Sequence, residues 1–198
     1  MTAPVLSSSE ALPVILSSFP VTDILVRRGA TQSEAGAIFS PCETFRYLLW
    51  RMWDPSLPFC SFGMLNPSTA DHMKLDPTIT RCKARAVDGG AGGLLVWNLF
   101  AYRATDPKVM KAADDPVGPL NDLAIRVGVD ASAVNVAGWG AHGLHLKREF
   151  HVRKMLADHD AQLHAIAFTA AGLPRHPLYL SSDLGPRPWP YSPQEDPA

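Results

Sequence analysis

Short continuous apolar runs alternate along the chain with amphipathic stretches. Four of the apolar runs have the length and the branched or aromatic content of buried strands. Continuous apolar runs of this kind are typical of parallel strands that are covered on both faces. The runs that predict strands span residues 58–65, 92–100, 132–140 and 161–168.

The amphipathic stretches between these runs carry helix signals. The segment DPTITRCKARAVDGG opens with an Asp-Pro start and closes with a Gly-Gly stop, and TDPKVMKAAD repeats the Asp-Pro start. An Asp cap followed by proline at the first helical position is a common way to begin a helix. The segments that predict helices span residues 76–90, 105–114, 118–131 and 145–159.

Strands that alternate with helices predict the fold class. We expect an α/β protein with three layers, α/β/α, around a central and mainly parallel sheet of about four strands. In such sheets, ligands bind beyond the carboxyl ends of the strands. Residues that directly follow a predicted strand are therefore the first place to look for chemistry.

The remaining segments divide the chain. Residues 1–40 are rich in Ser, Pro and Ala and predict an N-terminal arm or lead-in, residues 41–184 a single domain, and residues 185–198 a Pro-rich tail. The segment ETFRYLLWRMWD is compatible with a helix opened by a capping box, or with a strand that turns at DPSLP. Its aromatic and branched residues favour the strand.

Composition narrows the class of protein. A 198-residue chain with 46% hydrophobic and 19% charged residues is globular, and its formal net charge of −1 disfavours strong binding to phosphates without sequence preference. Three cysteines without CxxC spacing disfavour a disulfide framework or a zinc site. We expect a cytoplasmic protein, because no apolar run reaches membrane-spanning length and the N-terminus lacks the basic region of a signal peptide.

Two asparagines stand at the ends of predicted strands. Asn66 precedes Pro67, which disfavours a helical backbone at Asn66 and leaves its side chain free to point beyond the sheet edge. Asn98 follows the apolar run LLVW, so its amide must find partners in neighbouring loops or in a ligand. For both residues, a purely structural role and a ligand-binding role are about equally compatible with the sequence.

Other polar residues near the strand ends also have two interpretations. Ser68, Thr69 and Asp71 suit turn hydrogen bonds more readily than chemistry, and Asp76 is most simply a helix cap. In the first turns of the helix that begins there, Thr78 and Arg81 can hold an anion. Of the histidines, His176 is the most notable, because it precedes a proline in the loop after the last strand. Phe100 and Tyr102 suit the core more readily than a binding site, whereas contact with an anion and a structural pair with an acidic neighbour are equally compatible with Arg103.

Familiar signatures of enzyme classes are missing from the sequence. It contains no GxGxxG after a strand, no GxxxxGK[ST], no HExxH and no GxSxG. Dinucleotide oxidoreductases, P-loop NTPases, zinc proteases and serine hydrolases therefore lose support. We expect neither a metal nor an organic cofactor.

The segments LNPSTAD, DPTITRC, GGLLVWNLFAYRATDP, GPLND, GWGAHG and HPLYL together resemble the domain of unknown function 1643 family of bacteria and phages. The resemblance spans roughly residues 42–182. Four segments are also similar, in chain order, to motifs of the uracil-DNA glycosylase superfamily: LNPS, LLVWN, AGWGAHG and HPLYLSS. This second resemblance implies a glycosylase-like fold.

The glycosylase resemblance implies roles for individual residues. Asn66 would place the attacking water, Asn98 would bind the edge of an extruded base, and His176 would stabilise charge on the departing base. Asn66 stands where the most active glycosylases carry an aspartate, which implies a weaker hydrolase or none. The remaining candidates are Asp71 and Asp76 for catalysis, Phe100, Pro67 and Ser68 for base binding, and Arg81, Arg103, Thr78 and Arg175 for nucleic-acid or anion contact.

Three functions stay open at this point. The first is hydrolysis of an N-glycosidic bond of a base, possibly a modified one, in nucleic acid. The second is a binding module that recognises a nucleotide or modified base without cleaving it. The third is a hydrolase or transferase that acts on small nucleosides, which the near-neutral charge favours. All three expect a nucleobase, nucleotide or nucleic acid as the partner.

Overall fold

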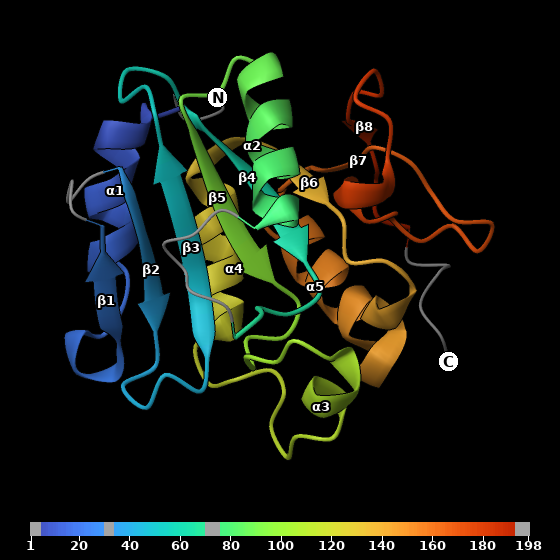
Figure 1. Ribbon diagram of the computed structural model, residues 1–198, viewed down its shortest axis with the longest axis horizontal. Coiled ribbons are helices and arrows are strands. Elements are labelled where there is room, and N and C mark those ends of the chain that lie inside the picture. Colours follow the sequence, from blue (N-terminus) through green and yellow to red (C-terminus); the bar gives the residue numbers. More distant parts are fainter. Residues whose placement is uncertain (1–4, 30–33, 70–75, 193–198) are drawn as a thin grey trace.

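The computed structural model describes residues 5–29, 34–69 and 76–192 (Figure 1). One sheet of eight strands runs through the molecule in the order β1-β2-β3-β5-β4-β6-β7-β8. The strands are β1 Leu25–Arg28, β2 Ala35–Phe39, β3 Arg46–Met52, β4 Phe59–Met64, β5 Gly93–Asn98, β6 Ser132–Ala137, β7 Leu163–Ala165 and β8 Arg187–Pro188.

The centre of the sheet is parallel and its flanks are antiparallel. β4 pairs in parallel with both β5 and β6, and β6 pairs in parallel with β7. These are the four strands that the apolar runs predicted. The prediction of a mainly parallel sheet of about four strands is nevertheless wrong, because antiparallel partners extend it at both edges: β1, β2 and β3 on one side and β8 on the other.

Helices cover both faces of the sheet (Figure 1). The α-helices are α1 Ser8–Ser17, α2 Pro77–Asp88, α3 Pro107–Lys111, α4 Asn121–Asp130 and α5 Arg148–Ala157, and the 3-10 helices are η1 Val21–Asp23, η2 Ala141–Lys147 and η3 Pro177–Tyr179. α1, α4 and α5 contribute buried residues to one hydrophobic core, and α2 contributes to a second core. The two cores lie on opposite faces of the central strands because side chains alternate along a strand.

Two helices begin as the sequence predicted. The Asp76 carboxylate accepts a hydrogen bond from the Ile79 backbone N–H at 2.7 Å, and Pro77 occupies the first turn of α2. The Asp106 carboxylate likewise accepts from the Lys108 N–H at the start of α3. These caps satisfy backbone donors that the first helical turn leaves without partners.

The ambiguous segment before β4 is a strand, as its composition favoured. All seven residues of β3 are buried, and the strand pairs with β2 and β5. The turn before β3 places Glu43 at a positive φ of 56°, so no helix begins there.

The described part of residues 1–40 has more structure than the predicted arm. Ser7 and Glu10 form a capping box at the start of α1, and α1 buries Ala11, Leu12 and Ile15 in the core. β1 and β2 extend the sheet. The sequence pattern missed these elements because Pro13 interrupts the apolar run of α1, and because β1 and β2 are only four and five residues long.

The Pro-rich C-terminal segment also contacts the domain. β8 pairs with β7, and the Trp189 ring lies 5.8 Å from the Trp139 ring. The Arg153 guanidinium stacks over Trp189 at 4.0 Å. Within the described residues, no helix combines the length and apolar character needed to cross a bilayer.

Gly63 in the central strand β4 allows Trp97 of β5 to pack directly across it. A Cβ at Gly63 would lie 2.2 Å from Cη2 of the fully buried Trp97 ring. We expect Gly63→Ala to lower the free energy of unfolding by about 1–3 kcal/mol, because either the ring or the strand must shift. Urea denaturation measures the change. The control is Gly185→Ala, where a Cβ meets no atom within 4 Å, and equal stability of the two variants would contradict the packing described here.

Candidate functional site

A cavity of about 410 Å³ lies at the carboxyl ends of the parallel strands. Met64, Leu65 and Asn66 line it from the end of β4, and Val96 and Asn98 from β5. Further lining residues come from the exit of β6, the start of α2, η3, the start of β3 and nearby loops: Trp139, Gly140, His142, Asp76, Thr78, Ile79, His176, Tyr179, Arg46, Ser68 and Pro107. The parallel pairing therefore gathers chain segments that are far apart in sequence around one space, as the α/β fold predicts.

Asn66 is held in one orientation at this cavity. Its side-chain amide nitrogen donates to the Ala104 carbonyl oxygen at 2.7 Å and to the Pro67 carbonyl oxygen at 3.2 Å. No described residue donates a hydrogen bond to its Oδ1. A fixed amide oxygen without a protein partner is suited to accept a hydrogen bond from a water or a ligand.

Asn98 is buried, with 2% of its surface exposed, and its side-chain Nδ2 has no hydrogen-bond partner among the described residues. Its backbone is fixed by a neighbour: the side-chain amide of Asn121, in α4, donates to the carbonyl oxygens of Asn98 and Leu99 at 3.0 and 2.9 Å. A buried amide donor costs free energy unless something accepts its hydrogen bond. The cavity that Asn98 lines is where an accepting ligand would fit.

Arg46, at the start of β3, lines the same cavity and was not among the residues that the sequence singled out. Its exposure is 7%, its Nε has no hydrogen-bond partner, and it makes no ion pair with a described residue. Burial lowers the pKa of Arg46 to about 10, with repulsion from Arg103 and Arg51 adding to the effect and Asp76 opposing it. The guanidinium is still charged at neutral pH, so a buried cation faces the cavity.

His176 is presented by the loop before η3. Its Nδ1 accepts a hydrogen bond from the Leu178 backbone N–H at 3.3 Å, so the proton of the neutral ring is on Nε2. Burial lowers the pKa of His176, although the nearby Asp76 carboxylate opposes the shift. The neutral ring is therefore a hydrogen-bond donor at the cavity through Nε2. The Tyr179 ring packs beside it, with 5.5 Å between the ring centroids.

Trp139 forms part of the cavity wall and is fixed from behind. Its indole Nε1–H donates to the buried Glu149 carboxylate at 2.7 Å, and its ring packs against Trp97 at 5.9 Å. His142 also lines the cavity, and its Nδ1 lies 3.1 Å from the Lys111 ammonium nitrogen. Together these residues give the cavity one rigid aromatic side.

Several residues that the sequence proposed do not line the cavity. Phe100 is fully buried in the core and packs against His145, and Pro67 contributes its carbonyl oxygen to the hydrogen bonds that hold Asn66 and Ala104. Arg103 stacks over Phe39 and donates to the Glu43 carbonyl oxygen. Arg81 and Arg175 are not among the residues that line the cavity, whereas Asn66, Ser68, Asp76, Thr78, Asn98 and His176 are. Asp71 lies outside the described residues.

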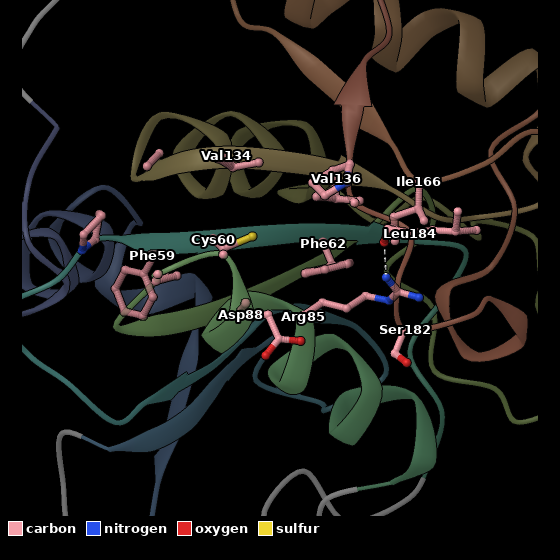
Figure 2. A pocket seen from close by; sticks show the side chains of 18 of the residues that line it. Phe59, Cys60, Phe62, Arg85, Asp88, Val134, Val136, Ile166, Ser182 and Leu184 are labelled. Carbon is pink, nitrogen blue, oxygen red and sulfur yellow. Dashed lines mark hydrogen bonds between the residues drawn. The ribbon is translucent and has the colours of Figure 1, made fainter.

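A second cavity, also of about 410 Å³, lies on the α2 face of the sheet and has a different character (Figure 2). The side chains of Phe62, Val136 and Ile166 point into it, and burial raises the pKa of the Cys60 thiol there to about 12. The Arg85 guanidinium donates to the carbonyl oxygens of Leu180, Ser181 and Leu184, although its Nε has no partner among the described residues. The cavity at the strand ends is the candidate site because it brings together Asn66, Asn98 and His176 at the carboxyl ends of the parallel strands.

Sequence reasoning found the residues that follow the parallel strands and missed those that reach the site from elsewhere. Arg46 carries one signal that was available, a charged residue inside the apolar run FRYLLW. The sequence does not show that Arg46 lies near the strand ends, because this depends on the antiparallel pairing of β3 with β5, which brings the start of β3 beside the end of β5. Within the part of the chain that the structure describes, no group of three or more His, Cys, Asp or Glu residues is arranged to hold a metal ion.

Comparison with protein-family models matches residues 46–178 to the family described as Protein of unknown function (DUF1643). The match covers more than half of the chain and includes every described residue that lines the cavity apart from Tyr179. No curated protein and no solved structure gives a significant match.

Asn98 and Asn121 allow the effect on stability of a proposed ligand-binding residue to be compared with that of a residue that holds the fold. Asn98→Leu removes an amide nitrogen that has no partner, so we expect the free energy of unfolding to stay within about 1 kcal/mol of wild type or to rise. Asn121→Leu removes two buried hydrogen bonds, to the carbonyl oxygens of Asn98 and Leu99, of which only the Leu99 oxygen keeps a second side-chain donor, Arg148 Nε–H, and it is expected to lower the free energy of unfolding by about 1–3 kcal/mol. Urea denaturation of both variants measures the contrast, and a larger loss for Asn98→Leu would show that Asn98 is structural.

His176 gives the stability a defined pH dependence. Because burial lowers its pKa, the unfolded chain binds this proton more tightly than the folded protein. The contribution of His176 to stability is full above the ordinary histidine pKa of about 6.5 and is lost as the pH falls below it. We expect the free energy of unfolding to fall less steeply between about pH 7 and pH 5 in His176→Gln than in wild type. The same substitution at the exposed His159 is the control for the general effect of removing an imidazole.

Proposed function

We propose that this chain, which belongs to the DUF1643 family, recognises a nucleobase in the strand-end cavity and hydrolyses its N-glycosidic bond. The observation that carries the proposal is that Asn66, Asn98 and His176 line one cavity. The glycosylase resemblance assigns these same residues complementary roles: placing a water, binding a base edge and stabilising a leaving group. The base can be a modified one, and it is taken up from nucleic acid.

The contacts of the three residues suit these roles. Asn66 Oδ1 accepts no hydrogen bond from a described residue and can accept one from the attacking water, while the two hydrogen bonds from the amide nitrogen fix its orientation. The free Nδ2 of Asn98 is available to a carbonyl or ring-nitrogen acceptor of a base. The Nε2–H of neutral His176 can donate to the base as it leaves with the electron pair of the glycosidic bond.

The cavity also has the size and lining that a nucleobase requires. A volume of about 410 Å³ is within the range of small-molecule sites, and the rigid Trp139 supplies apolar contact beside a few polar groups. A base in a duplex must first leave the stack to reach such a pocket. Asp76 is the one carboxylate among the described lining residues, and its bond to the Ile79 N–H keeps it at the cavity edge.

A second function, binding without cleavage, is favoured by one observation. The group that would place the water is an amide, and an amide cannot take a proton from it as a carboxylate can. The Asp76 carboxylate is engaged as a helix cap. In this alternative the same cavity holds a nucleotide or modified base, or serves a small nucleoside.

A base-release assay tests the proposal. Purified protein is incubated with single- and double-stranded DNA that carries uracil, mismatched thymine or modified pyrimidines, and free base is measured. We expect release from at least one substrate and a loss of roughly 100-fold or more in Asn66→Ala and His176→Ala, because each removes an interaction made to the reacting groups. His159→Ala, away from the cavity, is the control for general effects of removing an imidazole.

The outcomes separate the two functions. Release that both substitutions abolish supports hydrolysis and identifies the base. Binding of a base by folded wild-type protein without release, weakened by Asn98→Leu, supports the binding module instead. Release that survives in Asn66→Ala and His176→Ala would overturn the assignment of the site.

A further inference from the structure

We infer that the Arg46 end of the cavity is a phosphate subsite, so that the ligand is a nucleotide whose phosphate binds Arg46 while its base lies toward Asn98 and His176. The inference rests on the proposed function in placing a base in this cavity. The phosphate subsite itself follows from Arg46 and its surroundings alone. The phosphate belongs either to a free nucleotide or to a nucleic-acid strand.

The Arg46 side chain has no hydrogen-bond or ion-pair partner among the described residues. Only 7% of the residue is exposed, its Nε is buried without a hydrogen bond, and the guanidinium forms no ion pair with a described residue. A buried charge without a partner is costly, and proteins retain one where a ligand or a second charge compensates it. A planar guanidinium is the side chain best matched to the paired oxygens of a phosphate.

The charged groups around Arg46 are mostly cationic. Arg103 and Arg51 lie close enough to repel Arg46, whereas Asp76 attracts it. Arg103 is itself near the Glu43 carboxylate, at 4.0 Å, so it is Arg46 that remains without an acidic partner among the described residues. Thr78 adds a hydroxyl group, and the first turn of the twelve-residue helix α2 opens onto the same space. A helix N-terminus adds partial positive charge where an anion would lie.

The lining groups follow a definite order across the sheet. Arg46 comes from β3, Asn98 from β5, Asn66 from the end of β4, and Trp139 from the exit of β6, and these strands are consecutive neighbours. Strands are spaced about 4.8 Å apart, so the cavity spans roughly 14 Å from the Arg46 end to the Trp139 end. The cationic group lies at one end and the aromatic wall at the other. This order matches a ligand with a phosphate at one end and a base at the other.

The test compares the affinity of the protein for ligands with and without a phosphate group. Binding of a nucleoside, its 5′-monophosphate, inorganic phosphate and a short single-stranded oligonucleotide is measured by calorimetry at constant ionic strength, with wild type, Arg46→Met and Arg46→Lys. We expect wild type to bind the monophosphate or the oligonucleotide roughly 10- to 100-fold more tightly than the nucleoside. Arg46→Met should abolish that preference and Arg46→Lys should keep part of it. Arg28→Met, at an exposed position of β1, should behave as wild type.

Stability without ligand provides a second readout. Arg46→Met removes a buried, uncompensated charge, so its melting temperature should equal or exceed that of wild type. A melting temperature well below wild type would show that Arg46 is structural and would overturn the inference. So would equal affinity of wild type for the nucleoside and for both phosphate-bearing ligands, a result that needs no variant.

The two arms identify the source of the phosphate. A preference of wild type for the monophosphate indicates a free nucleotide, and a preference for the oligonucleotide alone indicates a strand phosphate; either one, lost in Arg46→Met, supports the subsite. Arg46-dependent phosphate binding without base release would leave this inference standing and remove hydrolysis. Base release with no effect of phosphate would do the reverse.

Discussion

The parallel pairing of β4 with both β5 and β6 is the constraint on which the rest of the structure depends. It fixes the carboxyl ends of three strands at one edge, so the chain must leave the sheet three times within a small area. Loops at such an edge cannot all be apolar, because their backbone groups need partners. Asn66, Asn98 and Trp139 stand at these exits, and the cavity is the space that their loops leave between them.

The polar groups around this space divide into those that hold the fold and those that do not. The side-chain amide of Asn121 donates hydrogen bonds to the carbonyl oxygens of Asn98 and Leu99 at the end of β5, and the Glu149 carboxylate accepts one from the Trp139 indole N–H. Asn98 Nδ2 and Arg46 Nε, by contrast, are buried donors with no partner among the described residues. Buried side-chain atoms without a partner also occur elsewhere among the described residues, for example at Trp50 Nε1, Arg103 Nε and Asn121 Oδ1, but Asn98 Nδ2 and Arg46 Nε are the two of them that line this cavity.

The sequence predicted the parts of the fold whose signals are local. Asp76-Pro77 marked a helix start that the structure confirms, and the four apolar runs became the four parallel strands. The antiparallel edge strands were not predicted, because β1 and β8 are short and carry exposed side chains. Neither an alternation of apolar and polar residues nor a high apolar content marks them in the sequence. Whether these segments pair as strands depends on their contacts with the rest of the folded chain, which a local sequence pattern does not contain.

The same distinction explains the site. Asn66 and Asn98 could be found because a residue at the end of a parallel strand has a predictable position. Phe100 lies only two residues beyond Asn98, yet it turns into the core, and nothing in a single sequence marks that turn. Arg46 is the converse case: it begins a strand, and only the antiparallel direction of β3 brings that beginning to the edge where its neighbour ends.

The bonds from Arg85 to the carbonyl oxygens of Leu180, Ser181 and Leu184 have a mechanical consequence. They tie the last turns of α2 to the segment that directly follows η3, and α2 also packs against η3. Asp76 and Thr78 are carried by the other end of α2, and His176 and Tyr179 by η3. Two walls of the cavity are thus tied to each other, while Asn98 and Arg46 belong to the sheet. A displacement of one of these two walls is therefore expected to move the other with it.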